Sequence, residues 1–107
     1  MLEDILQPQE TIIFRQHFET EVENETYNEL ALTNKRVILY KQKGLIFKKD
    51  SLSSVPLSSI SNVKFQEKGV IRKKGILELD ILKGQFPPIE GHPSEIKYIY
   101  QQILNHI

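Results

Sequence analysis

Several residue types are absent from this 107-residue chain or scarce in it, and each absence excludes a class of protein. The lack of cysteine excludes disulfide bonds, thiolate metal sites and cysteine nucleophiles, and it is consistent with a reducing compartment. Tryptophan is also missing and aromatic residues make up only 8%, so the core must consist mainly of isoleucine, leucine and valine. No apolar run approaches the roughly 20 residues that a transmembrane helix needs. Because residues 1–4 are acidic where a secretory signal would be basic, we expect a cytoplasmic chain, at most peripheral at a membrane.

What is present is typical of a globular protein, with 39% hydrophobic and 26% charged residues. The length predicts a single domain over residues 1–107. The formal net charge is zero, which argues against a nucleic-acid partner, but the charges are segregated. Residues 3–29 hold eight acidic side chains and one basic, whereas residues 30–74 hold eleven basic and two acidic. This segregation predicts either one basic face or acidic and basic strands that pair across a sheet.

Alternating apolar and polar residues predict a chain built mainly of strands over residues 10–90. A short helix or turn is expected before them, in residues 1–8, and the acidic residues 21–28 are expected to form a loop. Pro56 should end a strand or confine it to a sheet edge, because proline cannot donate to a strand ladder. For the same reason, Pro87 and Pro88 predict that any seventh strand is short and lies at an edge.

The C-terminal segment predicts an amphipathic helix over residues 93–106. Pro93 suits the first helical position, with His92 as the N-cap, and Glu95 favours the positive end of the helix. Apolar residues then recur with helical spacing at Ile96, Ile99, Tyr100, Ile103, Leu104 and Ile107. Since so short a helix is not stable alone in water, its apolar stripe should cover the strands.

One stretch of the chain has a pattern of short apolar segments separated by turns. Leu30–Tyr40 has two apolar strands around an Asn-Lys turn, and Gly44, a serine-rich strand and the turn Pro56–Ile60 follow. This order resembles the bacterial pleckstrin-homology-like domains and the related GRAM domains, from about residue 10 to the C-terminus. The resemblance implies a mainly β fold, a barrel or sandwich of about seven antiparallel strands in two packed sheets, capped by a C-terminal amphipathic helix.

No group of residues predicts catalysis. The histidines, His17, His92 and His106, lack the spacing of a metal site or an acid–base pair. Glu78 and Asp80 share one face of a strand, as a catalytic carboxylate pair would, but a solvated strand face explains them equally well. No glycine-rich loop opens a helix, as a phosphate-binding turn would require. We therefore expect no enzyme, with no catalytic residue, metal ligand, cofactor or small-molecule substrate.

Two basic clusters are candidate contact sites. The first is an apolar tip flanked by lysines, which suits an anionic membrane surface or a protein partner; it comprises Lys41, Lys43, Leu45, Ile46, Phe47, Lys48 and Lys49. Alternatively, its apolar residues fold back onto the core and its lysines only solvate the turn. The second cluster has the charge density for phosphate contacts, or else solubilises a hairpin tip; it comprises Lys68, Arg72, Lys73 and Lys74.

The chain departs from the family it resembles at one place. In phosphoinositide-binding members, basic residues in and around the loop between the first strands hold the head group. Here that loop is Thr20–Thr26, which contains three glutamates and no lysine or arginine. Because carboxylates repel a polyphosphorylated head group, we expect no conventional phosphoinositide site there.

These observations predict a non-enzymatic binding or scaffolding module that acts through protein contacts, with an unknown protein or with a second copy of itself. The alternative is a peripheral membrane module that contacts anionic lipid through the turn Gly44–Lys49.

Overall fold

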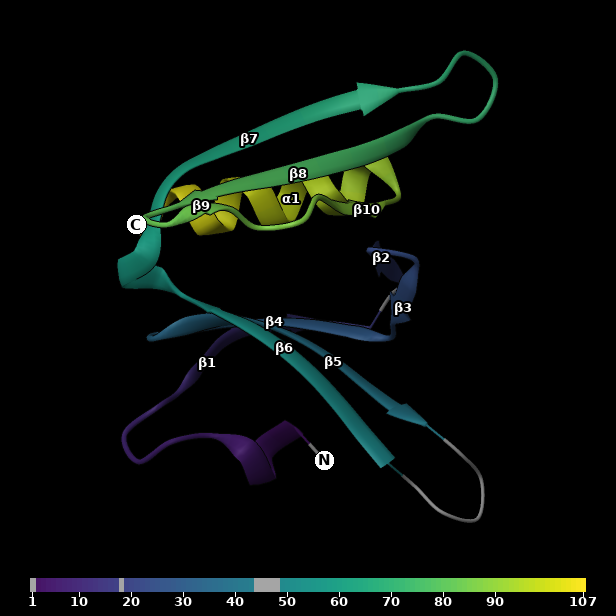
Figure 1. Ribbon diagram of the computed structural model, residues 1–107. Helices are drawn as coiled ribbons and strands as arrows, with labels where there is room; N and C mark the ends of the chain where they lie inside the picture. The colour runs from purple at the N-terminus through teal and green to yellow at the C-terminus, as the bar shows by residue number, and fades with distance from the viewer. Residues whose placement is uncertain (1, 18, 44–48) are drawn as a thin grey trace.

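Two antiparallel sheets face each other in the computed structural model, which describes residues 2–17, 19–43 and 49–107, and a helix packs against the second sheet (Figure 1). The first sheet has the order β1-β4-β5-β6, with β1 Ile12–Gln16, β4 Glu29–Thr33, β5 Arg36–Lys43 and β6 Lys49–Pro56. The second sheet has the order β3-β2-β10-β8-β7, with β3 Glu25–Tyr27, β2 Thr20–Val22, β10 Ile89–Gly91, β8 Lys74–Ile81 and β7 Ile60–Lys68.

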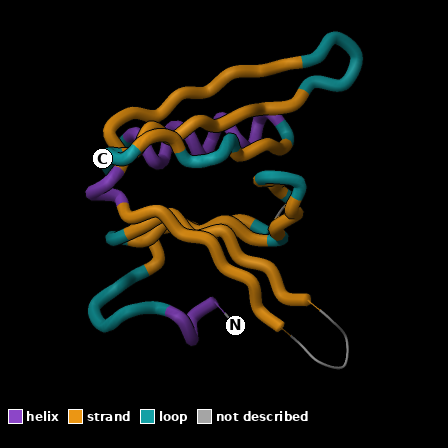
Figure 2. Tube along the Cα trace, viewed as in Figure 1, coloured by secondary structure: helices purple, strands orange, loops and turns teal. Residues whose placement is uncertain are grey.

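Four short elements complete the fold. The two-residue strand β9, Gly84–Gln85, pairs with β8, and η1, Leu2–Ile5, begins the chain. The two sheets are joined by η2, Leu57–Ser59, and the last element is α1, Pro93–Leu104. Figure 2 shows the strands in two layers with α1 beside the upper layer. The predicted mainly β fold with two sheets and a C-terminal helix is confirmed, although the described strands do not close into a barrel.

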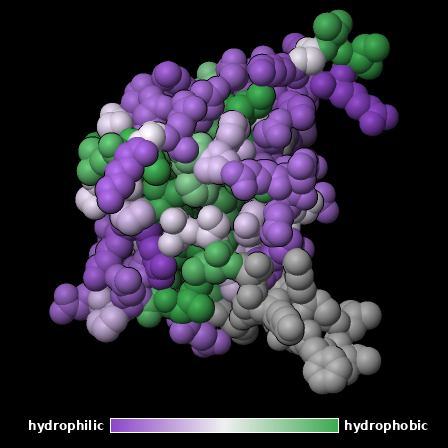
Figure 3. Space-filling view, viewed as in Figure 1, coloured by the Kyte–Doolittle hydropathy of each residue, from purple (hydrophilic) through white to green (hydrophobic). Residues whose placement is uncertain are grey.

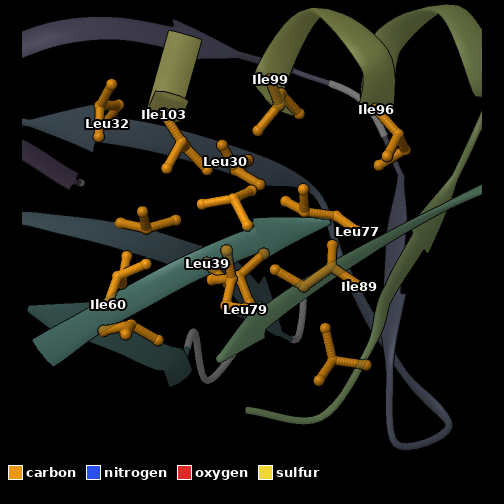
Figure 4. Close-up of a cluster of buried hydrophobic side chains, with 14 of the residues drawn as sticks. Leu30, Leu32, Leu39, Ile60, Leu77, Leu79, Ile89, Ile96, Ile99 and Ile103 are labelled. Atoms are coloured by element: carbon orange, nitrogen blue, oxygen red, sulfur yellow. The ribbon is translucent and has the colours of Figure 1, made fainter. Parts of the chain in front are cut away.

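The core lies between the sheets and is completed by α1 (Figure 4). Side chains of both sheets and the helix are fully buried there, among them Leu30, Leu32, Leu39, Leu77, Leu79, Ile96, Ile99 and Ile103. The helix approaches the second sheet closely at Gly75 in β8. A Cβ atom there would lie 2.9 Å from Ile96 Cβ and 3.0 Å from Pro93 Cα, so only glycine leaves room for this contact.

Strand β5 is apolar on both faces because it lies inside its sheet and separates two clusters. Val37 and Leu39 face the main core, whereas Ile38 and Tyr40 join Leu2 in a second cluster on the other side of the sheet. The N-terminal η1 therefore covers the outer face of the first sheet, in agreement with the helix or turn predicted over residues 1–8.

A buried ion pair holds the N-terminal segment in place. The Arg36 Nε atom donates to Glu10 Oε2 at 2.9 Å, and its Nη2 atom donates to the carbonyl of Ile5 at 3.0 Å. The Thr33 hydroxyl donates to the same carboxylate at 2.6 Å. With these charge-assisted hydrogen bonds, Arg36 lowers the pKa of Glu10 from 4.5 to about 2, aided by Thr33 and opposed by burial.

Two strand predictions were wrong. The acidic residues 21–28 do not form a plain loop: most of them form the β2–β3 hairpin, which turns at Glu23 and Asn24 with φ of 51° and 65°. The segment after Pro88 is short, as predicted, but β10 lies between β2 and β8 rather than at an edge. Pro88 comes directly before β10 and does not confine it to the edge, because the paired residues 89–91 keep their N–H groups.

The helix begins at the predicted Pro93 and ends at Leu104, two residues before the predicted end. The ring of His92 accepts a hydrogen bond from the Ser94 N–H at 3.4 Å, as expected of an N-cap. The predicted stripe is only partly buried: its centre lies in the core, while Leu104 and Ile107 are 48% and 49% exposed.

Candidate functional site

The first predicted basic cluster is described only in part: Lys41 and Lys43 belong to β5, and Lys49 begins β6. Its members Leu45, Ile46, Phe47 and Lys48 lie outside the described residues, between the end of β5 at Lys43 and the start of β6 at Lys49. The proposed membrane contact of this turn therefore stays a prediction.

Lys41 is the member of this cluster whose surroundings are described, and it is engaged within the fold. Its side chain is 11% exposed, and its Nζ atom lies 3.2 Å from Glu25 Oε2 and 5.5 Å from the centre of the Tyr27 ring. An ion pair and a cation–π contact thus join β5 to β3, and so the first sheet to the second. The segregated charges pair across strands here, one of the two arrangements that the sequence allowed.

The second basic cluster lies at the tip of the β7–β8 hairpin. Lys74 is partly engaged, because its Nζ atom lies 2.8 Å from Glu90 Oε1, and this hydrogen bond raises the pKa of Lys74. Lys68, Arg72 and Lys73 are exposed, and none of them forms an ion pair with another residue in the described ranges. The structure therefore leaves three cations at this tip in contact with solvent.

An open groove of about 320 Å³ lies beside the turn end of this hairpin, next to the start of α1. It is lined by Glu19, Glu21, Lys73, Lys74, Glu90, Gly91 and His92. Both signs of charge meet in it and the Lys74–Glu90 pair occupies its wall, so neither an anion nor a cation is strongly favoured.

The pair of carboxylates on β8 has an ordinary structural explanation. The Gln66 amide donates to Glu78 at 2.8 Å, and the Gln85 amide donates to Asp80 at 2.9 Å. The hydrogen bond from Gln85 is the main cause of a lowered pKa of Asp80, to which Lys64 at 3.7 Å also contributes. Both carboxylates therefore accept ordinary side-chain hydrogen bonds on one face of β8.

The free edge of β7 is a feature that the sequence did not reveal. β7 is the terminal strand of its sheet and runs for nine residues. Beside it, the ring of Phe65 lies 6.0 Å from the ring of Tyr100 on α1, and Leu104 follows one turn later on the helix. The edge of β7 thus lies beside a partly exposed apolar row of α1, which consists of Tyr100 and Leu104.

Within residues 2–17, 19–43 and 49–107, no group of three or more histidine, aspartate or glutamate side chains is placed to hold a metal ion. None of the described helices is long and apolar enough to span a bilayer.

The sequence profile of the bacterial pleckstrin homology domain matches residues 2–107. The chain belongs to this family. Pleckstrin homology domains are generally non-catalytic modules and often mediate protein or lipid interactions.

Two crystal structures show the same fold. One is a pleckstrin homology domain from Shewanella amazonensis SB2B, with 22% identity, coverage of 98% of this chain and 90% of that one, and a TM-score of 0.65. The other is a DUF1696 family protein with a pleckstrin homology domain from Shewanella loihica PV-4, with 24% identity, coverage of 98% and 86%, and a TM-score of 0.66. No curated protein matches the chain.

The glutamates of Thr20–Thr26 lead to a first prediction for this family member. A soluble inositol polyphosphate should leave the amide chemical shifts of Glu21, Glu23 and Glu25 unchanged, because the β2–β3 turn presents carboxylates and Glu25 already pairs with Lys41. An NMR titration checks this expectation. Saturable shifts centred on the turn would contradict it and indicate a conventional phosphoinositide site.

Proposed function

We propose that this bacterial pleckstrin homology domain is a non-catalytic binding module that takes up an extended protein segment along β7. The free edge of this nine-residue strand carries the proposal. An edge strand offers a row of backbone N–H and C=O groups, and an added strand gains affinity from main-chain hydrogen bonds.

The neighbouring helix would supply selectivity. Alternate side chains of an added strand point to the same face, so every second residue would lie toward α1. There it would meet Phe65, Tyr100 and the half-exposed Leu104. We therefore expect the bound segment to carry apolar residues at alternate positions.

A second copy of the chain can use the same edge. Two β7 strands related by a twofold axis would pair antiparallel, each contributing the same residues. Self-association and binding of another protein would then compete for one surface.

Selection of peptides from a random display library on the full chain tests this proposal. Enriched peptides should alternate apolar and polar residues, and Leu104→Lys should weaken their binding about tenfold, because it places a charge in the apolar row. Leu82→Lys is the matched control, since Leu82 is an exposed leucine on the β8–β9 turn and belongs to neither β7 nor α1.

The oligomeric state is measured on the same variants by analytical ultracentrifugation. A dimer that Leu104→Lys dissociates and Leu82→Lys leaves intact would identify a second copy as the occupant. If no peptide is enriched and the chain is monomeric at all concentrations, or if both variants behave alike, the β7 edge is not the binding surface.

A further inference from the structure

Two apolar residues at the tip of the β7–β8 hairpin are almost completely exposed. Val70 and Ile71 are 94% and 95% exposed, more than any other large hydrophobic residue that the structure describes. The hairpin projects beyond the rest of the second sheet (Figure 1), and green apolar surface lies at its tip in Figure 3. Neither residue therefore contributes to the core, and their place at the tip calls for another explanation.

Gly69 fixes the shape of this tip. Its φ of 106° favours glycine, and a Cβ atom added there would lie 2.2 Å from the carbonyl oxygen of Arg72. The chain therefore folds back tightly between Lys68 and Lys74, which are paired in the β7–β8 ladder, and holds the two apolar residues at the end of the hairpin.

Cations surround the apolar pair. Lys68, Arg72 and Lys73 are exposed beside it, and Glu67 is the acidic residue nearest in sequence. Lys74, the first residue of β8, is neutralised by Glu90. The tip thus combines two apolar side chains with a local excess of positive charge.

We propose that this tip docks on an anionic lipid surface, with Val70 and Ile71 in the headgroup region and the three cations against lipid phosphates. A convex tip without a surrounding rim suits a bilayer, which yields to an inserted side chain, whereas a protein partner would have to supply a matching pocket. Each cation near an anionic surface should raise the partition coefficient about fivefold. Salt should weaken the binding, because it screens this attraction.

The absence of tryptophan from the chain allows a direct measurement of insertion. The full chain carrying Ile71→Trp is mixed with vesicles of phosphatidylcholine, with and without phosphatidylglycerol. With phosphatidylglycerol, the emission should shift to the blue, and brominated lipid should quench it. Leu82→Trp is the control, because Leu82 is 75% exposed but lies on the β8–β9 turn at the other end of β8; its emission should change little.

Co-sedimentation then measures the affinity for vesicles without the introduced tryptophan. Val70→Ser with Ile71→Ser should lower binding to the phosphatidylglycerol vesicles about tenfold, and Arg72→Glu with Lys73→Glu by more than that. Leu82→Ser should bind within about twofold of the unmodified chain at the same salt. So should Lys83→Glu with Lys97→Glu, two exposed residues whose replacement changes the net charge as much as the Arg72 and Lys73 variant does. Circular dichroism verifies that each variant is folded.

Two results would overturn the proposal. If the unmodified chain does not sediment with phosphatidylglycerol vesicles even at low salt, the tip is not a lipid anchor, and a protein pocket remains as its partner. If the chain sediments but both tip variants bind as tightly as the unmodified chain, another surface makes the contact. Loss of binding in Lys48→Glu with Lys49→Glu would then indicate the β5–β6 turn.

Discussion

Replacing Ile99 and Ile103 together with aspartate should leave the chain unfolded. Both side chains are fully buried between α1 and the strands. Burying each isoleucine contributes about 1.5–3 kcal/mol, and a buried unpaired carboxylate adds a further cost of several kcal/mol. Because small domains are stable by only about 5–15 kcal/mol, this double substitution should exceed the free energy of unfolding. Circular dichroism and thermal melting of the purified chain measure the effect.

Lys97→Asp with Gln101→Asp is the control for this experiment. These residues lie on the exposed side of the same helix, so the same number of aspartates is introduced without burial. The control should melt cooperatively within a few degrees of the unmodified chain. A cooperative melt of the isoleucine double variant would instead show that α1 is an appendage and not part of the core.

Glu10→Gln should destabilise the chain by up to about 3 kcal/mol at neutral pH, and by much less near pH 2. The carboxylate is buried, and Arg36 and Thr33 hold its pKa at about 2 instead of 4.5. A depressed pKa stabilises the fold at pH values above that of the unfolded chain, near 4.5. This stabilisation is lost as the pH falls from there through about 2.

Urea unfolding of both proteins between pH 2 and pH 7 measures this dependence. Glu67→Gln, which changes an exposed glutamate, should follow the unmodified chain at all pH values. The account of the buried ion pair would be wrong if the Glu10→Gln variant were equally destabilised at every pH, because the loss would then be one of packing only.

The periodic parts of the fold could be predicted from the sequence. Ile96, Ile99 and Ile103 are buried as the helical spacing predicts, and the turn at Asn34 and Lys35 joins β4 to β5 where it was expected. In each case a regular apolar pattern coincides with a residue that ends the element, so local and tertiary preferences agree.

Other features depend on tertiary contacts that no local pattern encodes. The β2–β3 hairpin is rich in glutamate, yet Val22 and Tyr27 are buried because the hairpin adds to the edge formed by β10. The signals available in the sequence were Asn24, a residue type that tolerates the positive φ found there, and the alternation of Thr20–Val22. The sequence indicates a surface cation at Lys41, because its pairing with Glu25 depends on how the two sheets meet.

The candidate surfaces were the least predictable part. The basic residues around Val70 and Ile71 were evident and a hairpin tip was one expectation for them, but two apolar residues in a charged segment can be buried or exposed, and only the fold shows that these two are exposed. The edge of β7 depends on strand order, which one sequence does not reveal. Because this edge and the tip belong to one hairpin, a lipid-docked chain would hold the proposed protein-binding edge near the membrane.

Amide hydrogen exchange of β7, with and without the tightest peptide from the library, tests the proposed binding mode most directly. An added strand must accept hydrogen bonds from the N–H groups on the free edge, which belong to alternate residues of an edge strand. Alternate amides within residues 60–68 should therefore gain protection when the peptide binds, while those paired with β8 change little. Protection gained instead around Glu19 and His92, in the charged groove, or no gain within β7, would contradict the account.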